Sequence, residues 1–137
     1  MRPLNDIHKR VLPGLVIAAC LFTTHAYADD VEKLLFLVVD KDEVIASNTK
    51  LGRFDRLEMS AKEHILEYKA SNAVAVVITN QRFAAYGVYP GNWNSRRVIA
   101  GEKAELLEVA DYSATLVTSD RILNFYGRTG TWSETKR

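Results

Sequence analysis

Residues 75–93 read AVVITNQRFAAYGVYPGNW, and residues 114–132 read ATLVTSDRILNFYGRTGTW. At an offset of 39 residues the two stretches align without a gap, and the identical pairs are Ala75/Ala114, Thr79/Thr118, Arg82/Arg121, Gly91/Gly130 and Trp93/Trp132. Residues 36–54 align at the same offset, with Gly52 and Phe54 in the places of Gly91 and Trp93. A glycine followed two residues later by an aromatic residue therefore ends three successive units. Matches at one fixed spacing predict a repeat architecture.

Each unit has the composition of a β-hairpin. Residues 73–79 and 114–118 are rich in Val, Ile, Leu and Thr, and each run ends in a short polar turn before the partner strands 82–87 and 121–127. Residues 35–39 and 43–47 repeat this pattern in the first unit. Further strands are expected in the linking segments, at 54–59, 64–70, 93–99 and 104–110.

One linking segment leaves two structures open. Residues 61–70 carry Ile65, Leu66 and Lys69 at helical spacing, so a helix is the alternative to a strand. We favour a strand, because the hairpins need partners. The linkers also correspond between units, since Ala61-x-Glu63 matches Ala100-x-Glu102.

Four short strands in roughly 40 residues are typical of a β-propeller blade. The run LVTSDRILNFYGRTGTW resembles the blade repeat of quinoprotein-type propellers, and its ending, residues 129–132, is one residue shorter than the Thr-Gly-x-x-Trp of that family. The resemblance implies an all-β fold of three blade-like units at approximately 34–72, 73–111 and 112–137. It also implies that the aromatic residues at the unit ends, Phe54, Trp93 and Trp132, pack between neighbouring blades.

The resemblance carries no cofactor, since we find no counterpart of a quinone or calcium site. The last unit stops after its third strand, whereas propellers have more blades. A threefold β fold such as the β-trefoil, which has three units of similar length, is the main alternative. The Thr-x-x-Arg hairpin is also similar to strands of bacterial pleckstrin-homology-like domains.

The first 28 residues have the pattern of an export signal. Arg2, Lys9 and Arg10 precede an apolar run from Val11 to Thr24, and Ala26-Tyr27-Ala28 is a small-x-small cleavage site. We expect residues 29–137 to form the mature β-repeat domain in the periplasm or outside the cell. Because the apolar run is shorter than the roughly 20 residues of a membrane-spanning helix, we expect no transmembrane span in the mature chain.

A lipoprotein is the alternative destination. Ile17-Ala18-Ala19-Cys20 resembles a lipobox, in which Cys20 would carry the lipid anchor. Removal of residues 1–28 takes away three basic residues and one acidic residue, which changes the net charge from +1 to −1. A net charge near zero argues against a nucleic-acid partner.

The residue types that common catalytic sites need are scarce after residue 28. His64 is the only histidine, no cysteine remains, and no Gly-x-Ser-x-Gly motif occurs. Asp40, Asp42 and Glu43 do not recur in the other units and are interpreted as a solvated turn; Arg96-Arg97 is interpreted as part of a surface strand. We therefore expect no enzyme, no catalytic or metal-binding residues and no cofactor.

The aromatic residues are the strongest candidates for function. Phe54, Trp93, Trp132, Tyr89 and Tyr126 are candidates for an interface or a ligand platform. The expected function is binding or scaffolding through self-assembly, with a second copy or another envelope protein as partner. A carbohydrate-binding, lectin-like module is the alternative. One expected assembly is a twofold dimer of six blades, in which residues 31–36 complete the partner's shortened third unit.

Overall fold

The structure is a computed structural model and describes residues 32–137. The predicted cleavage site after Ala28 and the possible anchor Cys20 lie outside these residues. The described part is all-β, as predicted from the repeats, and contains no helix. Its strands are β1 (Leu35–Val39), β2 (Glu43–Asn48), β3 (Arg53–Glu58), β4 (Ile65–Ala70), β5 (Val74–Thr79), β6 (Arg82–Gly87), β7 (Asn92–Arg97), β8 (Ala104–Val109), β9 (Ser113–Thr118), β10 (Arg121–Tyr126) and β11 (Thr131–Lys136).

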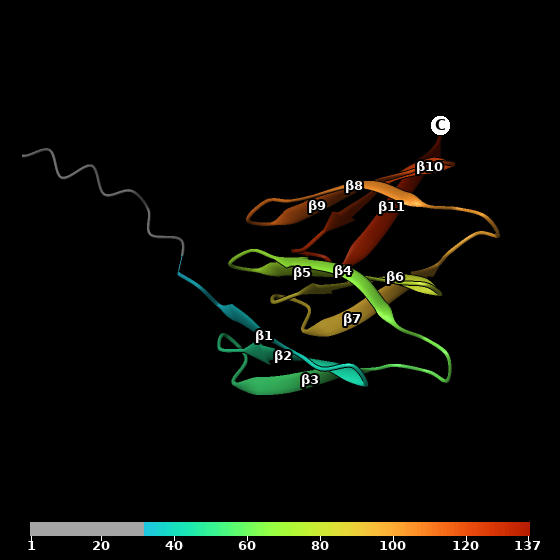
Figure 1. Ribbon diagram of the computed structural model, residues 1–137. Helices are drawn as coiled ribbons and strands as arrows, with labels where there is room; N and C mark the ends of the chain where they lie inside the picture. The colour runs from blue at the N-terminus through green and yellow to red at the C-terminus, as the bar shows by residue number, and fades with distance from the viewer. Residues whose placement is uncertain (1–31) are drawn as a thin grey trace, which may run out of the picture. The chain divides into compact units, whose positions relative to one another are not determined.

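The strands form three antiparallel sheets, and each sheet takes its strands in chain order (Figure 1). The first sheet is β1-β2-β3, the second is β4-β5-β6-β7, and the third is β8-β9-β10-β11. No strand of one sheet pairs with a strand of another within residues 32–137. This separation into three meanders differs from the single closed barrel that a trefoil requires.

The sheets do not begin where the sequence units begin. The segment 61–70 contains a strand, not a helix, and that strand, β4, pairs with β5 of the following hairpin. In the same way β8 pairs with β9, so the third sheet has all four strands. The expectation that residues 31–36 complete a shortened third unit is therefore wrong. The three-stranded sheet is the first one, and β1 already pairs with β2.

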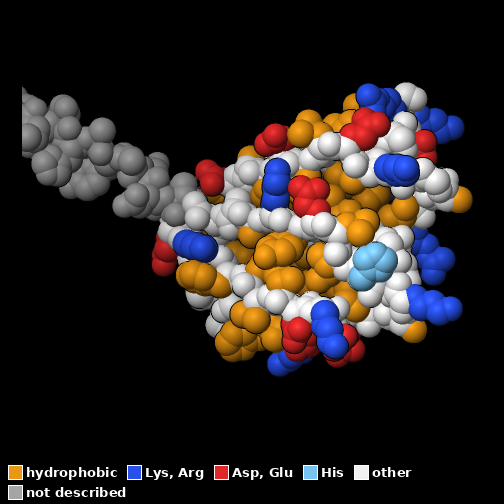
Figure 2. All heavy atoms as spheres, in the orientation of Figure 1, with side chains coloured by type: hydrophobic (Ala, Val, Ile, Leu, Met, Phe, Trp, Pro, Cys, Tyr) orange, Lys and Arg blue, Asp and Glu red, His pale blue; other side chains and the backbone are white. Residues whose placement is uncertain are grey.

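Burial shows how the sheets stack. Every residue of β5 is buried, and β6 is buried except for Arg82 at its start, because the second sheet is covered on both faces. In β2 and β9 buried and half-buried residues alternate, as expected for sheets covered on one face only. Figure 2 shows hydrophobic side chains gathered between the layers of β1 and β4, with charged side chains around them.

Two apolar cores separate the layers. Leu35, Ala46 and Leu57 of the first sheet pack with residues of the second, including Val77 and Tyr86. The opposite face of the second sheet packs on the third through the cluster Val74, Val76, Ile78, Phe83, Ala85, Leu107, Ala114, Leu116, Leu123, Phe125 and Trp132. None of the described residues forms a helix that is long and apolar enough to cross a membrane.

Candidate functional site: sheet junctions and outer faces

The tryptophans at the unit ends join each sheet to the one before it. Trp93 in β7 donates from Nε1 to the carbonyl oxygen of Asp55 in β3, at 3.2 Å. Trp132 in β11 makes the same bond to the carbonyl oxygen of Asn94 in β7, at 3.0 Å. The Trp93 ring lies 5.2 Å from Tyr86, and the Trp132 ring lies 5.2 Å from Phe125, centroid to centroid. Both tryptophans therefore dock neighbouring sheets, as the resemblance implied.

Phe54 occupies the same place in β3, but no sheet precedes it in the described chain. Its side chain is 71 % exposed, whereas Trp132 is 7 % exposed. Phe54 therefore has the position of a docking residue without a surface to dock on.

Other exposed apolar residues lie on the same face as Phe54. Phe36 and Val38 are 47 % and 58 % exposed, and they occupy the places of Ala75 and Val77, which are fully buried. Ile45 faces the same way, because it pairs with Val38 across the ladder. We call the surface formed by Phe36, Val38, Ile45 and Phe54 the docking face.

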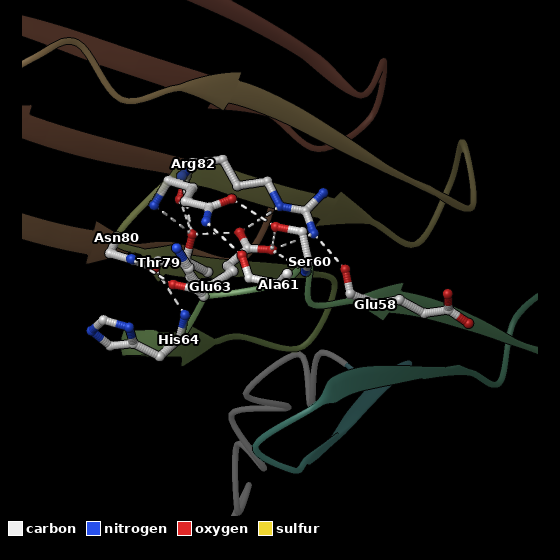
Figure 3. Close-up of polar contacts among 10 residues, drawn as sticks. Glu58, Ser60, Ala61, Glu63, His64, Thr79, Asn80 and Arg82 are labelled. Carbon is white, nitrogen blue, oxygen red and sulfur yellow. Dashed lines mark hydrogen bonds and ion pairs between the residues drawn. The ribbon is translucent and has the colours of Figure 1, made fainter.

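A buried polar cluster accompanies each junction, and we call it a clamp. In the first clamp Arg82 donates to Glu63 from Nε at 2.8 Å and from Nη2 at 3.0 Å, while Thr79 donates to Glu63 at 2.7 Å (Figure 3). Arg82 Nη2 also donates to the carbonyl oxygen of Glu58, the last residue of β3 in the preceding sheet. The clamp therefore ties the second sheet to the first.

The second clamp repeats the first one 39 residues later. Arg121 donates to Glu102 from Nε at 2.9 Å and from Nη2 at 3.0 Å, and Thr118 donates to Glu102 at 2.6 Å. Arg121 Nη2 reaches the carbonyl oxygen of Arg97, the last residue of β7, at 2.7 Å. The side chains of Glu63 and Glu102 are 1 % and 0 % exposed, so both carboxylates depend on these partners.

The clamps lower the pKa of their carboxyl groups. Burial of Glu102 acts to raise its pKa, but hydrogen bonds from Arg121, the Ile99 amide and Thr118 outweigh burial, and the net pKa lies below the ordinary value. Glu63 follows the same pattern with Arg82, Thr79 and the Ser60 amide. Both glutamates are therefore held ionised in the folded protein.

The outer face of the third sheet has a different chemistry from that of the first. Two cross-strand rows on it carry uncharged polar groups, Thr115–Asn124–Ser133 and Ser113–Tyr126–Thr131. Sheets one and two have Leu35 and Val74 where this face has Ser113, and both of those residues are buried. Tyr126 is 50 % exposed in a hollow of about 330 Å³ lined by both rows.

Tyr89 lies elsewhere, at the end of the sheets where β6 turns into β7. It is half-buried, and its ring centroid lies 5.2 Å from Lys50 Nζ and 5.4 Å from Arg128 Cζ. Tyr112 lies 6.1 Å from Tyr89 between ring centroids. Because two cations and a second ring already surround it, Tyr89 is a packing residue of the turns. The five candidate residues therefore divide between two junctions, two outer faces and one turn cluster.

His64 and Glu43 have no part in a shared catalytic site. His64 is exposed at the start of β4, and its backbone amide bonds to the Asn80 side chain at 2.8 Å. Glu43 pairs with Arg56 at 2.8 Å on the outer side of the first sheet. Comparisons of the chain with protein-family models, with curated proteins and with solved structures found no match.

The clamps are what sequence reasoning missed. The alignment contained all three pairs of equivalent residues, Glu63/Glu102, Thr79/Thr118 and Arg82/Arg121. The signal that could have found them is that a glutamate and an arginine both repeat at one spacing next to buried strands. Such charges need each other inside a fold.

Proposed function

We propose that residues 29–137 act as an exported binding or scaffolding protein that self-associates through the docking face. The observation that carries the proposal is the exposure of Phe54 at a position where Trp93 and Trp132 each dock one sheet on another. The chain order of the strands and the repeated junctions also support a blade-like organisation of the sheets.

The two outer faces favour face-to-face pairing over a head-to-tail stack. A head-to-tail arrangement would place the docking face on the third sheet, where Thr115, Asn124 and Ser133 meet it with polar groups. Apolar side chains gain little from such a surface, because its hydroxyl and amide groups would lose water. Two docking faces that meet across a twofold axis bury Phe36, Val38 and Phe54 of both copies instead.

The experiment is light scattering of residues 29–137 against a Phe54→Ser variant over a range of concentrations. We expect wild type to form a dimer and the variant to dissociate at least about tenfold more readily, as removal of a central aromatic anchor does. Tyr126→Ser is the matched control, since it removes an equally accessible ring from the other outer face. Equal association of wild type and Phe54→Ser would refute the proposal.

A second candidate is carbohydrate binding by the outer face of the third sheet. The observation that favours it is Tyr126, an exposed ring beside the hydroxyl and amide groups of Thr115, Asn124 and Ser133. Aromatic rings stack on the apolar faces of sugars, and neutral polar groups bond sugar hydroxyls. A glycan array should then show binding that Tyr126→Ser abolishes and Phe54→Ser preserves; an array without any bound glycan would end this candidate.

A further inference from the structure

The first sheet lacks the strand that precedes the hairpin in the other two sheets. β5 has β4 beside it and β9 has β8, but β1, which holds the equivalent place, pairs only with β2 within the described residues. β1 is therefore an edge strand where its counterparts are central strands.

The open edge of β1 presents backbone groups at the spacing of a strand. The Asp40 amide bonds to the Glu43 carbonyl at 2.9 Å, and the Thr49 amide bonds to the Leu34 carbonyl at 3.0 Å. Even-numbered residues therefore bond to β2, because bonded and non-bonded pairs alternate in an antiparallel ladder. The N–H and C=O groups of Leu35, Leu37 and Val39 point to the open side. The strand itself, LFLVV, has no charge or proline that would block pairing.

A groove of about 520 Å³ follows this edge, between the end of β1 and β4. Tyr68 and Ile65 of β4 line it, together with Val39. Tyr68 is 51 % exposed, whereas Leu107 at the same place in β8 is 2 % exposed. Tyr68 is accessible because the strand that would cover it is absent.

The groove admits one strand but not the edge of another sheet. β4 lies beside β1 and β5, over the place that the added strand would take. A second copy that paired its own β1 there across a twofold axis would bring its second sheet to the same side. That sheet would collide with β4. The occupant is therefore a single extended segment.

We propose that the groove between β1 and β4 binds an extended peptide segment of a partner protein by strand addition, antiparallel to β1. Six residues is the length of β4 and β8, which fill the equivalent places. Side chains on one side of the segment meet Tyr68 and Ile65, and those on the other side continue the surface of Phe36 and Val38. The segment is therefore apolar on both sides, and its backbone supplies the hydrogen bonds.

This site goes beyond self-association, because it uses the edge of the first sheet and Phe54 does not line it. Peptide binding by the Phe54→Ser variant separates the two proposals. If the variant is monomeric and still binds peptide, both proposals stand. If wild type is monomeric and binds peptide, only the docking-face proposal fails.

The experiment is amide hydrogen exchange by NMR on residues 29–137. The probe is the peptide Lys-Lys-Val-Ala-Val-Val-Ile-Thr-Lys-Lys, whose apolar part copies residues 74–79. At saturating peptide we expect the amides of Leu35, Leu37 and Val39 to exchange at least about tenfold more slowly, as newly bonded amides do. Phe36 and Val38 are internal controls, because their amides already face β2.

Two further comparisons separate strand addition from non-specific adhesion. A peptide of the same sequence with every amide of the apolar part N-methylated should give no protection. Tyr68→Ser should weaken binding at least about fivefold, the effect of about 1 kcal/mol, while Tyr126→Ser, a ring of equal exposure on the other outer face, should leave it unchanged. Unchanged exchange of the three amides, or equal protection by the methylated peptide, would overturn the proposal.

Discussion

Phe54, Trp93 and Trp132 occupy one place in the repeat, but they have different surroundings. Trp93 and Trp132 each reach a backbone carbonyl of the preceding sheet, and Phe54 reaches solvent. The spacing of glycine and aromatic residue predicts the docking role and does not predict which copy lacks a partner surface. That depends on whether another sheet precedes the residue, which no local pattern records.

Replacement of the docking tryptophan should cost far more stability than replacement of Phe54. Trp132→Ala should lower the free energy of unfolding by about 3–5 kcal/mol, because it removes a buried ring and leaves a cavity. Phe54→Ala should change it by less than about 0.5 kcal/mol at concentrations where the chain is monomeric, as exposed residues do. Urea midpoints measure both variants, and a Trp132→Ala midpoint equal to wild type would disprove the docking role.

The second clamp should make a large contribution to stability. In Glu102→Gln the buried Arg121 loses its principal anion, and we expect a loss of about 3 kcal/mol in the free energy of unfolding. Glu105→Gln is the matched control, since Glu105 pairs with Arg137 on the surface and both side chains are about half exposed. That variant should lose less than about 1 kcal/mol. Similar losses in the two variants would show that the clamp is only a surface ion pair.

The clamps also predict how stability depends on pH. The pKa values of Glu63 and Glu102 are lowered in the folded protein, so their contribution is complete above the unfolded value of 4.5 and disappears as the pH falls through the folded values. Wild type should therefore lose stability steeply below pH 4.5, and Glu102→Gln should lose less over the same range. Urea unfolding across this pH range gives both curves; parallel curves would contradict the predicted shift.

At the scale of the strands, sequence predicted nearly every element and misplaced the boundaries between units. Alternating apolar runs located all of the strands within one or two residues, including β4 and β8. The repeat alignment began each unit at a hairpin, so it assigned β4 to the unit before it. Pairing of β4 with β5 is a tertiary choice between two adjacent hairpins, and strand composition is the same for both.

Close approach between the second and third sheets makes Gly87 sensitive to substitution. A Cβ at Gly87 would overlap the backbone carbonyl of Gly127, so Gly87→Ala should cost about 1–3 kcal/mol, as overpacking does. Gly52 has φ +67° with open space around it. Asparagine tolerates that conformation, so Gly52→Asn should change stability by less than about 0.5 kcal/mol. Thermal unfolding compares the two variants, and a stable Gly87→Ala would refute the tight spacing.

For the whole molecule, the two ends of the stack differ in chemistry. The third sheet ends the stack with threonine, serine and asparagine, as the terminal unit of a repeat protein does. The first sheet ends it with exposed Phe36, Val38 and Phe54. The sequence contains this asymmetry, but it becomes visible only when the strand register assigns each residue to a face.

The sequence is also informative about assembly only in part. It predicts association from an open repeat without disulfides, and the structure locates the apolar surface on the first sheet. A six-blade ring through the third sheet would bury polar rows against apolar groups, so pairing of the two first sheets is the arrangement that we now expect. The edge groove of β1 remains free in that arrangement.

Sedimentation equilibrium of residues 29–137 tests this central claim most directly. We predict a reversible dimer with twice the mass of the chain, which Phe54→Ser converts to a monomer and Tyr126→Ser does not. A wild-type protein that stays monomeric at all concentrations, or a dimer that persists in Phe54→Ser and disappears in Tyr126→Ser, would contradict it.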